Sequence, residues 1–312
     1  MTTIEKIIEI NRNPDLSPWF RNKLTELISF GVYHNDMPAL RAKLVDSLKD
    51  YKKKYNIYTV VIGMSGGIDS ALVAALFKEA GYRVIGVTLP IHQNPEETAR
   101  GIEACHALSL EHINVDLTGQ YDSVLADMLS NLSDTSIAND DRETALRRGN
   151  IRARLRMITL YNLAGKHKGF VASTDNFSEL AAGFWTLHGD VGDVAPIQGL
   201  TKSWEVPALA ELMGVPESII KAVPTDGLGI ANGDEDQFGF SYLHFDIGLF
   251  SLMRRSSLVS AKGDDKRILD AIADRIRGST YKRANPFNID HPMDLTRYDG
   301  LKQLDYTLRS EK

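Results

Sequence analysis

Apolar residues in the first 55 positions recur at the spacing of an α-helix. Separated mostly by three or four positions, they are Ile4, Ile7, Ile8, Ile10, Leu24, Leu27, Ile28, Leu40, Leu44, Val45 and Leu48. Such spacing places apolar side chains on one face of a helix. The lysines at positions 52–54 favour a helix end, because cations are stabilising at the negative pole of the helix dipole. We therefore expect residues 1–55 to form a helical N-terminal extension.

Short β-branched runs alternate with helical patterns from residue 58 to residue 174. The predicted strands are residues 58–65, 83–91, 111–117 and 169–174. The predicted helices are residues 69–80, 94–108 and 149–166, and the polar stretch 119–145 is expected to be mostly helix and loop. This alternation is typical of an α/β fold with an open parallel sheet and helices on both of its faces.

Composition and charge narrow the classes of function. The net charge of −5 over 312 residues argues against a broad nucleic-acid or acidic-membrane surface. Cys105 is the single cysteine, so we expect a small buried apolar side chain and no disulfide framework. No apolar run approaches the roughly 20 residues of a membrane span, and the charged N-terminus does not resemble a signal peptide. We expect a cytoplasmic protein without nucleic-acid or membrane partners.

The stretch VIGMSGGIDSALVAALF joins the first predicted strand to the helix that follows it. Gly66 and Gly67 allow the backbone to approach an anion, and the next helix offers unpaired N–H groups at its positive end. Ligands bind at this edge of open parallel sheets, so the loop fits a pyrophosphate. Asp69 would repel phosphate unless a cation lay between them, which predicts bridging Mg²⁺. The alternative is an ordinary turn in which serine and aspartate cap the helix.

The segment RRGNIRARLRM, residues 147–157, contains five arginines. In a helix, Arg152 and Arg156 would share one face and Arg154 would point elsewhere. Such a helix could hold a polyanionic ligand through bidentate contacts. The alternative interpretation is a solvated basic face.

Residues 173–202 contain several further charged candidates. Asp175 and Glu179 are four positions apart, so both carboxylates would lie on one helical face, where they could share a metal ion or be solvated. Asp190 and Asp193 lie in a glycine-containing turn. Lys202 ends a Gly-Leu-Thr-Lys loop, where its charge could neutralise phosphate.

These motifs together resemble a known enzyme family. SGGIDS is similar to the nucleotide loop of the N-type ATP pyrophosphatases. GNIRARLRM, STDNFSELAAGFWT, GDVGDVAP, GLTK and PTDGL resemble the ammonia-dependent NAD synthetases in order and spacing. The resemblance implies one domain, residues 1–312, with the adenine nucleotide alpha hydrolase-like fold. Within it we expect an ATP pyrophosphatase core at 58–225 and, at 226–312, a lid loop and a C-terminal substrate and dimer segment.

The resemblance also implies roles for individual residues. The ATP-binding residues would be Gly63, Ser65, Gly66, Gly67, Asp69, Ser70, Thr174, Lys202 and Thr225. Asp69 and Glu179 would hold Mg²⁺. The substrate-binding residues would be Arg154, Asp190, Asp193, Tyr281 and Lys282, and the catalytic residues would be Asp69, Lys202 and Asp193. The turn between Asp190 and Pro196 is one residue shorter than in the family, so the choice between the two aspartates stays open.

The implied activity is the ATP-dependent amidation of nicotinic acid adenine dinucleotide (deamido-NAD) to NAD. Ammonia would attack an acyl-adenylate intermediate, and AMP and pyrophosphate would be released. A glutamine-using version would need an additional amidase domain, for which this chain has no room, so free ammonia is the expected nitrogen donor unless a separate glutaminase subunit supplies it. Family members are usually homodimers, and the apolar faces in residues 1–55 and 149–166 are candidate interfaces.

Two positions depart from the family pattern. Leu187 stands where the family usually has lysine, and Tyr281 stands where it has histidine. Both positions contact deamido-NAD in the family, so the preferred acceptor could instead be nicotinic acid mononucleotide. A tRNA-modifying ATP pyrophosphatase and a non-catalytic nucleotide-binding protein are the rival classes. The first would show a basic surface or further cysteines, and the second would not need Asp69, Glu179 and Lys202 together.

Overall fold

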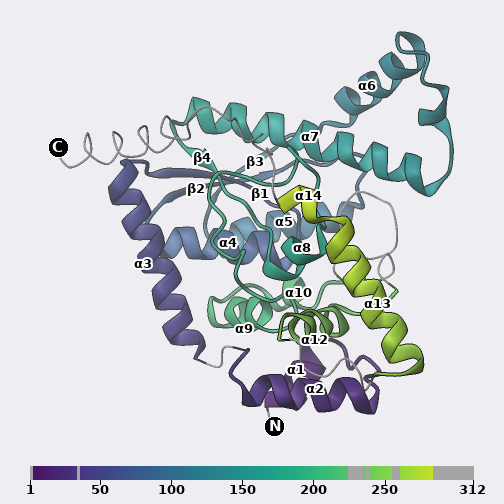
Figure 1. The fold of residues 1–312 in the computed structure, drawn as a ribbon. Coiled ribbons are helices and arrows are strands. Elements are labelled where there is room, and N and C mark those ends of the chain that lie inside the picture. The colour runs from purple at the N-terminus through teal and green to yellow at the C-terminus, as the bar shows by residue number, and fades with distance from the viewer. Residues whose placement is uncertain (1–2, 34–35, 224–234, 236–238, 255–260, 284–312) are drawn as a thin grey trace, which may run out of the picture.

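A parallel β-sheet lies at the centre of the computed structural model, which describes residues 3–33, 36–223, 235, 239–254 and 261–283 (Figure 1). The four strands are β1 (Thr59–Gly63), β2 (Arg83–Thr88), β3 (Glu111–Asn114) and β4 (Phe170–Val171), in the order β3-β2-β1-β4. Val61 of β1 pairs with Ile85 on one side and Val171 on the other. The predicted open parallel sheet is confirmed, and each strand lies within its predicted range.

Helices cover both faces of the sheet (Figure 1). Helix α7 (Arg142–Lys166) packs on one face, where Val61 and Met157 share a buried cluster that also includes Tyr121 of α6 (Thr118–Ser130). Helices α4 (Ile68–Glu79) and α5 (Pro95–Ala107) cover the other face, where Val60 and Leu72 are buried together. The central strands β1 and β2 are therefore largely buried on both sides, as a parallel sheet between two helical layers requires, whereas the edge strand β3 is partly exposed.

The predicted helical N-terminal extension is confirmed as α1 (Thr3–Ile10), α2 (Pro18–Ser29) and α3 (Met37–Tyr55). Ile7, Phe20, Leu24 and Leu27 are almost completely buried within the chain's own core. The apolar face that we expected as a dimer surface in residues 1–55 is therefore already covered within the subunit. Helices α1 and α2 lie at the end of the molecule remote from the sheet, below α9 and α12 (Figure 1).

The remaining described elements are η1 (Thr135–Ala138), α8 (Phe177–Ala182), α9 (Glu205–Leu212), α10 (Glu217–Ile220), α12 (Tyr242–Met253), α13 (Gly263–Gly278) and α14 (Thr280–Arg283). Helices α9 and α10 pack on α4, and α12 packs on α2. The lid expected at 226–241 lies almost entirely outside the described residues, as does Thr225. The proposed division of the chain at residue 226 therefore stays a prediction.

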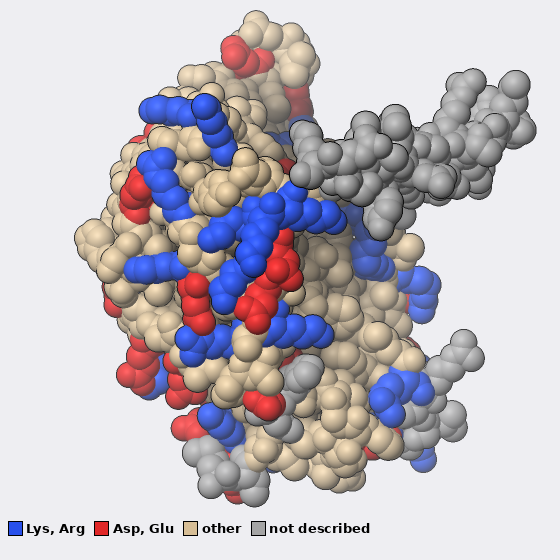
Figure 2. Space-filling view, turned by 90° about the vertical axis from the view of Figure 1, so that its left-hand side faces the viewer, with Lys and Arg blue, Asp and Glu red and all other residues tan. Residues whose placement is uncertain are grey.

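Charged side chains of both signs lie together on the face shown in Figure 2, which corresponds to the α3 side of Figure 1. One ion pair joins Arg41 of α3 to Glu79 of α4, with 2.9 Å between the nitrogen and the carboxylate oxygen. Within the described ranges, no helix combines the length and the apolar character needed to cross a bilayer. This face is a mixed polar surface and not a continuous basic one.

Candidate active site

A cavity of about 570 Å³ opens beyond the carboxyl end of β1. This is the edge of an open parallel sheet where ligands bind, and the volume is typical of a ligand pocket. The predicted site residues that line the cavity are Gly63, Ser65, Gly66, Gly67, Asp69, Ser70, Arg154, Thr174, Glu179, Asp190, Lys202, Tyr281 and Lys282. The structure thus brings together residues from six separate parts of the chain.

The loop between β1 and α4 has the shape that its glycines predict. Gly66 has a φ of 85°, and a Cβ atom there would lie 2.2 Å from the backbone oxygen of Glu97. The Gly67 N–H donates to Ser65 Oγ at 3.2 Å, and Ser70 Oγ donates to the Gly67 carbonyl at 3.0 Å. Gly67 is the N-cap of α4, and no side chain of the described structure caps it. The first turn of α4 is therefore not closed by the Ser or Asp cap that the alternative interpretation requires.

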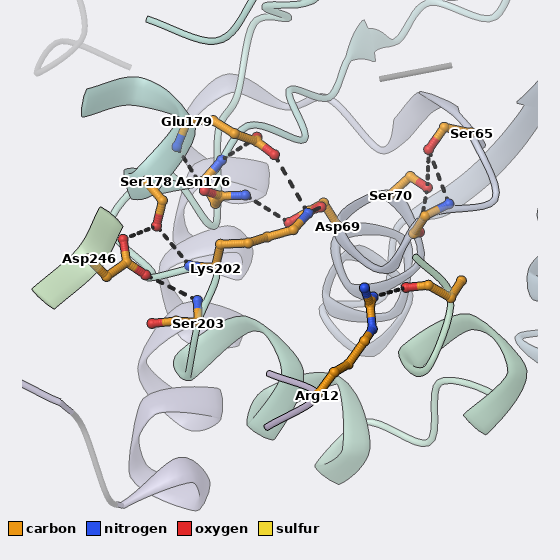
Figure 3. Close-up of polar contacts among 12 residues, drawn as sticks. Arg12, Ser65, Asp69, Ser70, Asn176, Ser178, Glu179, Lys202, Ser203 and Asp246 are labelled. Atoms are coloured by element: carbon orange, nitrogen blue, oxygen red, sulfur yellow. Dashed lines mark hydrogen bonds and ion pairs between the residues drawn. The ribbon is translucent and has the colours of Figure 1, made fainter. Parts of the chain in front are cut away.

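Two carboxylates share one lysine beside this loop (Figure 3). Lys202 Nζ bonds to Asp69 and lies 3.5 Å from Glu179 Oε1. Asn176 Nδ2 donates to the other oxygen of Asp69 at 3.0 Å. The Lys202 side chain is 9% exposed, and each carboxylate side chain is 14% exposed. Asp69 and Glu179 therefore face a common point at which one cation already lies.

This pair of carboxylates fits Mg²⁺. Within the described part of the chain, no three His, Cys, Asp or Glu side chains converge to hold a metal ion. Magnesium is usually held by one or two carboxylates, with substrate phosphates and water as its other ligands. Asp69 and Glu179 would be the protein's share of such a site.

The predicted pairing of Asp175 with Glu179 on one helical face is wrong. Helix α8 begins only after Asn176, whose side chain accepts from the Glu179 N–H at 3.0 Å, while the Glu179 carboxylate accepts from the Asn176 N–H at 3.3 Å. Asp175 precedes this capping box and accepts from Gln198 Nε2 at 2.5 Å. Asn176 was missed as a site residue, although the spacing Asn-x-x-Glu is a recognisable helix start.

The backbone around Lys202 is fixed by a buried carboxylate on α12 (Figure 3). Asp246 accepts from Ser178 Oγ at 2.6 Å and from the Ser203 N–H at 3.1 Å. Ser178 Oγ in turn accepts from the Lys202 N–H at 2.9 Å. Complete burial raises the pKa of Asp246 to about 6, although these hydrogen bonds and Lys202 oppose the shift. No sequence pattern pointed to Asp246.

Arginines of α7 border the cavity on the opposite side. Arg154 and Arg156 both line the cavity, and their Nε atoms donate to the carbonyls of Leu187 at 3.3 Å and of Leu89 at 3.0 Å. Arg152 lies over the ring of Tyr121, with 5.1 Å between the guanidinium carbon and the ring centroid. The predicted helix is confirmed, and it begins earlier than residue 149. Arg142, at the start of α7, also lines the cavity, so three of the helix's cations border it.

Helix α14, the last one that the structure describes, completes the wall near α8. Lys282 Nζ donates to the carbonyls of Gly183 at 2.7 Å and of Trp185 at 2.5 Å. Burial lowers the pKa of Lys282, and nearby Arg275 lowers it further. Tyr281 also lines the cavity but is 63% exposed.

The two candidate aspartates lie in different surroundings. Asp190 lines the cavity, through which solvent reaches it, and accepts from the Thr186 N–H at 2.6 Å. Protein packed around this carboxyl raises its pKa, against the lowering effect of that hydrogen bond. Asp193 does not line the cavity in the described structure; it accepts from Tyr161 OH at 2.8 Å and from the Val171 N–H at 2.9 Å.

Cys105 lies on α5 and is completely buried. Burial raises the pKa of its thiol to about 11, which disfavours the nucleophilic thiolate. The expectation of a small buried apolar side chain is confirmed.

Comparison with known proteins places these features in one family. Residues 40–286 match the family model described as NAD synthase. An NH(3)-dependent NAD(+) synthetase from Alkaliphilus oremlandii is 33% identical over 246 residues, 78% of this chain and 94% of that protein. The solved structure of an NMN synthetase from Francisella tularensis superposes with a TM-score of 0.71 and 28% identity, over 83% of this chain and all of that one. An NH3-dependent NAD synthetase from Campylobacter jejuni gives a TM-score of 0.65 and 27% identity, over 82% of this chain and all of that one. The chain therefore belongs to the NAD synthase family.

Proposed function

We propose that this protein is an ammonia-dependent NAD synthetase, which amidates the nicotinate carboxylate of deamido-NAD at the expense of ATP. The observation that carries the proposal is the convergence of Asp69, Glu179 and Lys202 beside the glycine loop of the cavity. A chain of the NAD synthase family with this arrangement has the charges that cleavage of ATP to AMP requires. The names of its relatives support the same reaction.

The first step activates a carboxylate that cannot lose its oxygen unaided. A carboxylate oxygen attacks the α-phosphorus of ATP, and the bond from that phosphorus to the oxygen bridging it to the β-phosphorus breaks. Pyrophosphate leaves with that electron pair, and the nicotinate becomes an acyl adenylate. The oxygen that must later depart now belongs to AMP, which is a good leaving group.

Negative charge accumulates on phosphate oxygens during this step, and groups beside the glycine loop would neutralise it. The backbone N–H groups between Ser65 and Ser70 and the start of α4 would bind the leaving phosphates. Lys202 would exchange its bond to Asp69 for a phosphate oxygen. Asp69 and Glu179 would hold Mg²⁺, which supplies further neutralisation of phosphate charge when bound.

In the second step, ammonia attacks the acyl carbon and AMP leaves. Ammonium must lose a proton before it can attack, so the site needs a carboxylate that accepts one. We assign this role to Asp190 in preference to Asp193, because Asp190 lines the cavity and Asp193 does not in the described structure. Both oxygens of Asp193 already accept hydrogen bonds.

A second candidate acceptor is nicotinic acid mononucleotide. Leu187 provides no cation at the cavity, and Tyr281 replaces the family's histidine. The similarity to the NMN synthetase of Francisella tularensis favours the same alternative. The chemistry at phosphorus and at the acyl carbon would be unchanged, because only the remote part of the acceptor differs.

Steady-state turnover with each acceptor separates these possibilities. ATP, Mg²⁺ and ammonium are supplied with deamido-NAD or with nicotinic acid mononucleotide, and AMP and the amide are both quantified. We expect equimolar AMP and NAD, with a higher kcat/KM for the dinucleotide. A higher kcat/KM for the mononucleotide selects the second candidate. ATP binding without AMP formation with either acceptor would contradict both.

We also propose a homodimer that uses α7. Ile158 and Tyr161 on this helix are 67% and 41% exposed, whereas the apolar face of the N-terminal helices is covered. Light scattering should report a dimer for the wild type. The variant Ile158→Glu should shift it toward monomer; an unchanged mass would contradict this choice of surface.

A further inference from the structure

The first two helices lie outside the part of the chain that matches the family model. That match begins at residue 40. The segment comprising residues 3–33, here called the N-terminal segment, includes α1, α2 and Tyr33. Its buried side chains Ile7, Phe20 and Leu24 anchor it to the rest of the molecule.

The N-terminal segment packs directly on α12, the helix that carries Asp246. The ring centroid of Phe20 lies 4.8 Å from that of His244, and the ring centroid of Tyr33 lies 6.0 Å from that of Phe250. Tyr33 is fully buried, and its pKa is raised by that burial and by the charge of nearby Asp246. The N-terminal segment therefore packs on the helix whose Asp246 holds the backbone next to Lys202.

Two polar contacts extend from the end of α1 to the walls of the cavity. Asn11 Nδ2 donates to the carbonyl of Ile7, at the end of its own helix, and to the carbonyl of Ser203, both at 2.7 Å. Arg12 donates to the carbonyl of Ala222 at 2.8 Å (Figure 3). Ser203 directly follows Lys202, and Ala222 itself lines the cavity.

The backbone that follows Lys202 is thus held at two consecutive peptide groups, the one between Lys202 and Ser203 and the one between Ser203 and Trp204. The Ser203 N–H donates to Asp246, while the Ser203 carbonyl accepts from Asn11. The Lys202 N–H donates to Ser178, the neighbour of Glu179. A shift of this backbone would move the ammonium of Lys202 away from Asp69 and Glu179, and misplacement by about 1 Å is enough to slow catalysis.

We infer that Asn11 and Arg12 are positioning residues, through which the N-terminal segment braces two walls of the nucleotide cavity. Asn11 fixes the peptide group between Ser203 and Trp204, which adjoins that of Lys202, and Arg12 fixes the segment that ends at Ala222. The catalytic part of this inference, that the two residues affect turnover, rests on the proposed function. The mechanical part, that they hold the backbone of the cavity walls in place, does not. Neither residue touches the reacting groups.

Hydrogen exchange tests the mechanical part without any substrate. Mass spectrometry on the complete chain compares wild type with Asn11→Ala at the amides of Lys202 and Ser203. We expect exchange there to accelerate about two- to tenfold, the range set by the loss of one hydrogen bond. Asn131→Ala is the matched control, because Asn131 donates to Asp127 at 3.0 Å on the exposed surface of α6. Unchanged exchange in Asn11→Ala would overturn the inference.

Turnover tests the catalytic part. We expect Asn11→Ala to lower kcat by about three- to tenfold while the KM for the acceptor changes less than about twofold. Asn11→Asp keeps the size but removes the donor, so it should be slower still. Arg12→Ala should mainly raise the KM for ATP. A reduced melting temperature with wild-type kcat and KM would show a purely structural role and would overturn the inference.

The design separates two kinds of failure. If the wild type forms no AMP with either acceptor, the proposed function fails, and the exchange rates still decide the brace. If the wild type turns over but Asn11→Ala matches it in both hydrogen exchange and turnover, the inference about the brace is wrong while the proposed function stands. Should Asn11→Ala not fold, Arg12→Ala decides, because its contact is exposed; an unchanged KM for ATP would then overturn the inference.

Discussion

The two halves of the cavity are built in different ways. On the proposed phosphate side, Asp69, Glu179 and Lys202 are nearly buried, and the lysine contacts both carboxylates. On the proposed acceptor side, Tyr281 is 63% exposed and Arg154 is exposed, with one contact to the Leu187 carbonyl. The proposed phosphate half is thus preorganised by the chain's own contacts, whereas Tyr281 and Arg154 of the proposed acceptor half are open to solvent.

This difference indicates where reaction and specificity reside. Preorganised charges stabilise a transition state because they need little rearrangement when charge develops. An open surface with few contacts contributes less to the rate and can change its ligand with few substitutions. We therefore expect large losses from changes in the phosphate half and modest shifts in preference from changes in the acceptor half.

The largest loss should follow Asp69→Asn. This variant removes one of the two carboxylates that would hold Mg²⁺, and it removes the ion pair to Lys202. We expect AMP and pyrophosphate formation to fall together by about 10²- to 10³-fold. Asp46→Asn, on the exposed side of α3, is the matched control and should retain full activity. Normal turnover by Asp69→Asn would show that the metal assignment is wrong.

Gly66→Ala should be the next most damaging change. A Cβ atom at this position would collide with the Glu97 carbonyl, and its φ of 85° is unfavourable for alanine. Strain of about 1–3 kcal/mol should weaken ATP binding by roughly tenfold or more, measurable by calorimetry. Gly119→Ala on α6, where a Cβ atom meets nothing within 4 Å, is the control. Equal ATP affinity in the two variants would contradict the loop geometry.

The support beneath the phosphate half should show itself in the pH dependence of stability. Asp246 has a pKa of about 6 in the folded protein and about 3.9 in an unfolded chain. Between pH 4 and 6 the folded state retains a proton that the unfolded state has lost, so the free energy of unfolding falls as pH rises and levels off above 6. Relative to Asp246→Asn, which cannot titrate there, the wild type should lose on the order of 2 kcal/mol across this window. Chemical denaturation measures the difference in the free energy of unfolding between wild type and Asp246→Asn. If this difference stayed constant between pH 4 and 6, the raised pKa would be contradicted.

The smallest effect should come from the acceptor half. The double variant Leu187→Lys/Tyr281→His introduces the residues that the family resemblance leads us to expect, one at a half-buried position and one at an exposed position. We expect it to raise the kcat/KM ratio of dinucleotide to mononucleotide by about two- to fivefold, the range of exposed charge contacts. Leu212→Lys on α9 adds the same charge away from the cavity and should leave the ratio unchanged. If the kcat/KM ratio changed equally in the double variant and in Leu212→Lys, the effect would come from net charge and not from the acceptor half.

Much of the fold follows from local patterns. The β-branched runs predicted the strands because residues such as Val60 and Ile62 are buried between two helical layers. The start of α7 was placed too late, since the polar residues before 149 hid a helix that Asp141 caps by accepting from the Thr144 N–H. A polar stretch has no apolar periodicity from which a helix can be predicted. Its capping residue, here Asp141, is still a local signal of a helix start.

The site was predictable in part, for a similar reason. The loop at Gly66 and Gly67 could be interpreted from its own residues, whereas the roles of Arg154 and Asp190 followed only from resemblance to a family. Asp246 left no signal, because its bond to Ser203 joins positions 43 apart. Contacts between distant parts of a chain depend on packing that no local pattern encodes.

A crystal structure with a non-hydrolysable ATP analogue and Mg²⁺ tests the central claim most directly. The account predicts phosphates on the backbone N–H groups of Ser65–Ser70, with Mg²⁺ about 2.0–2.1 Å from oxygens of both Asp69 and Glu179. Lys202 should have turned from Asp69 to a phosphate oxygen. Phosphates bound away from this loop, or Mg²⁺ held by neither carboxylate, would contradict the account.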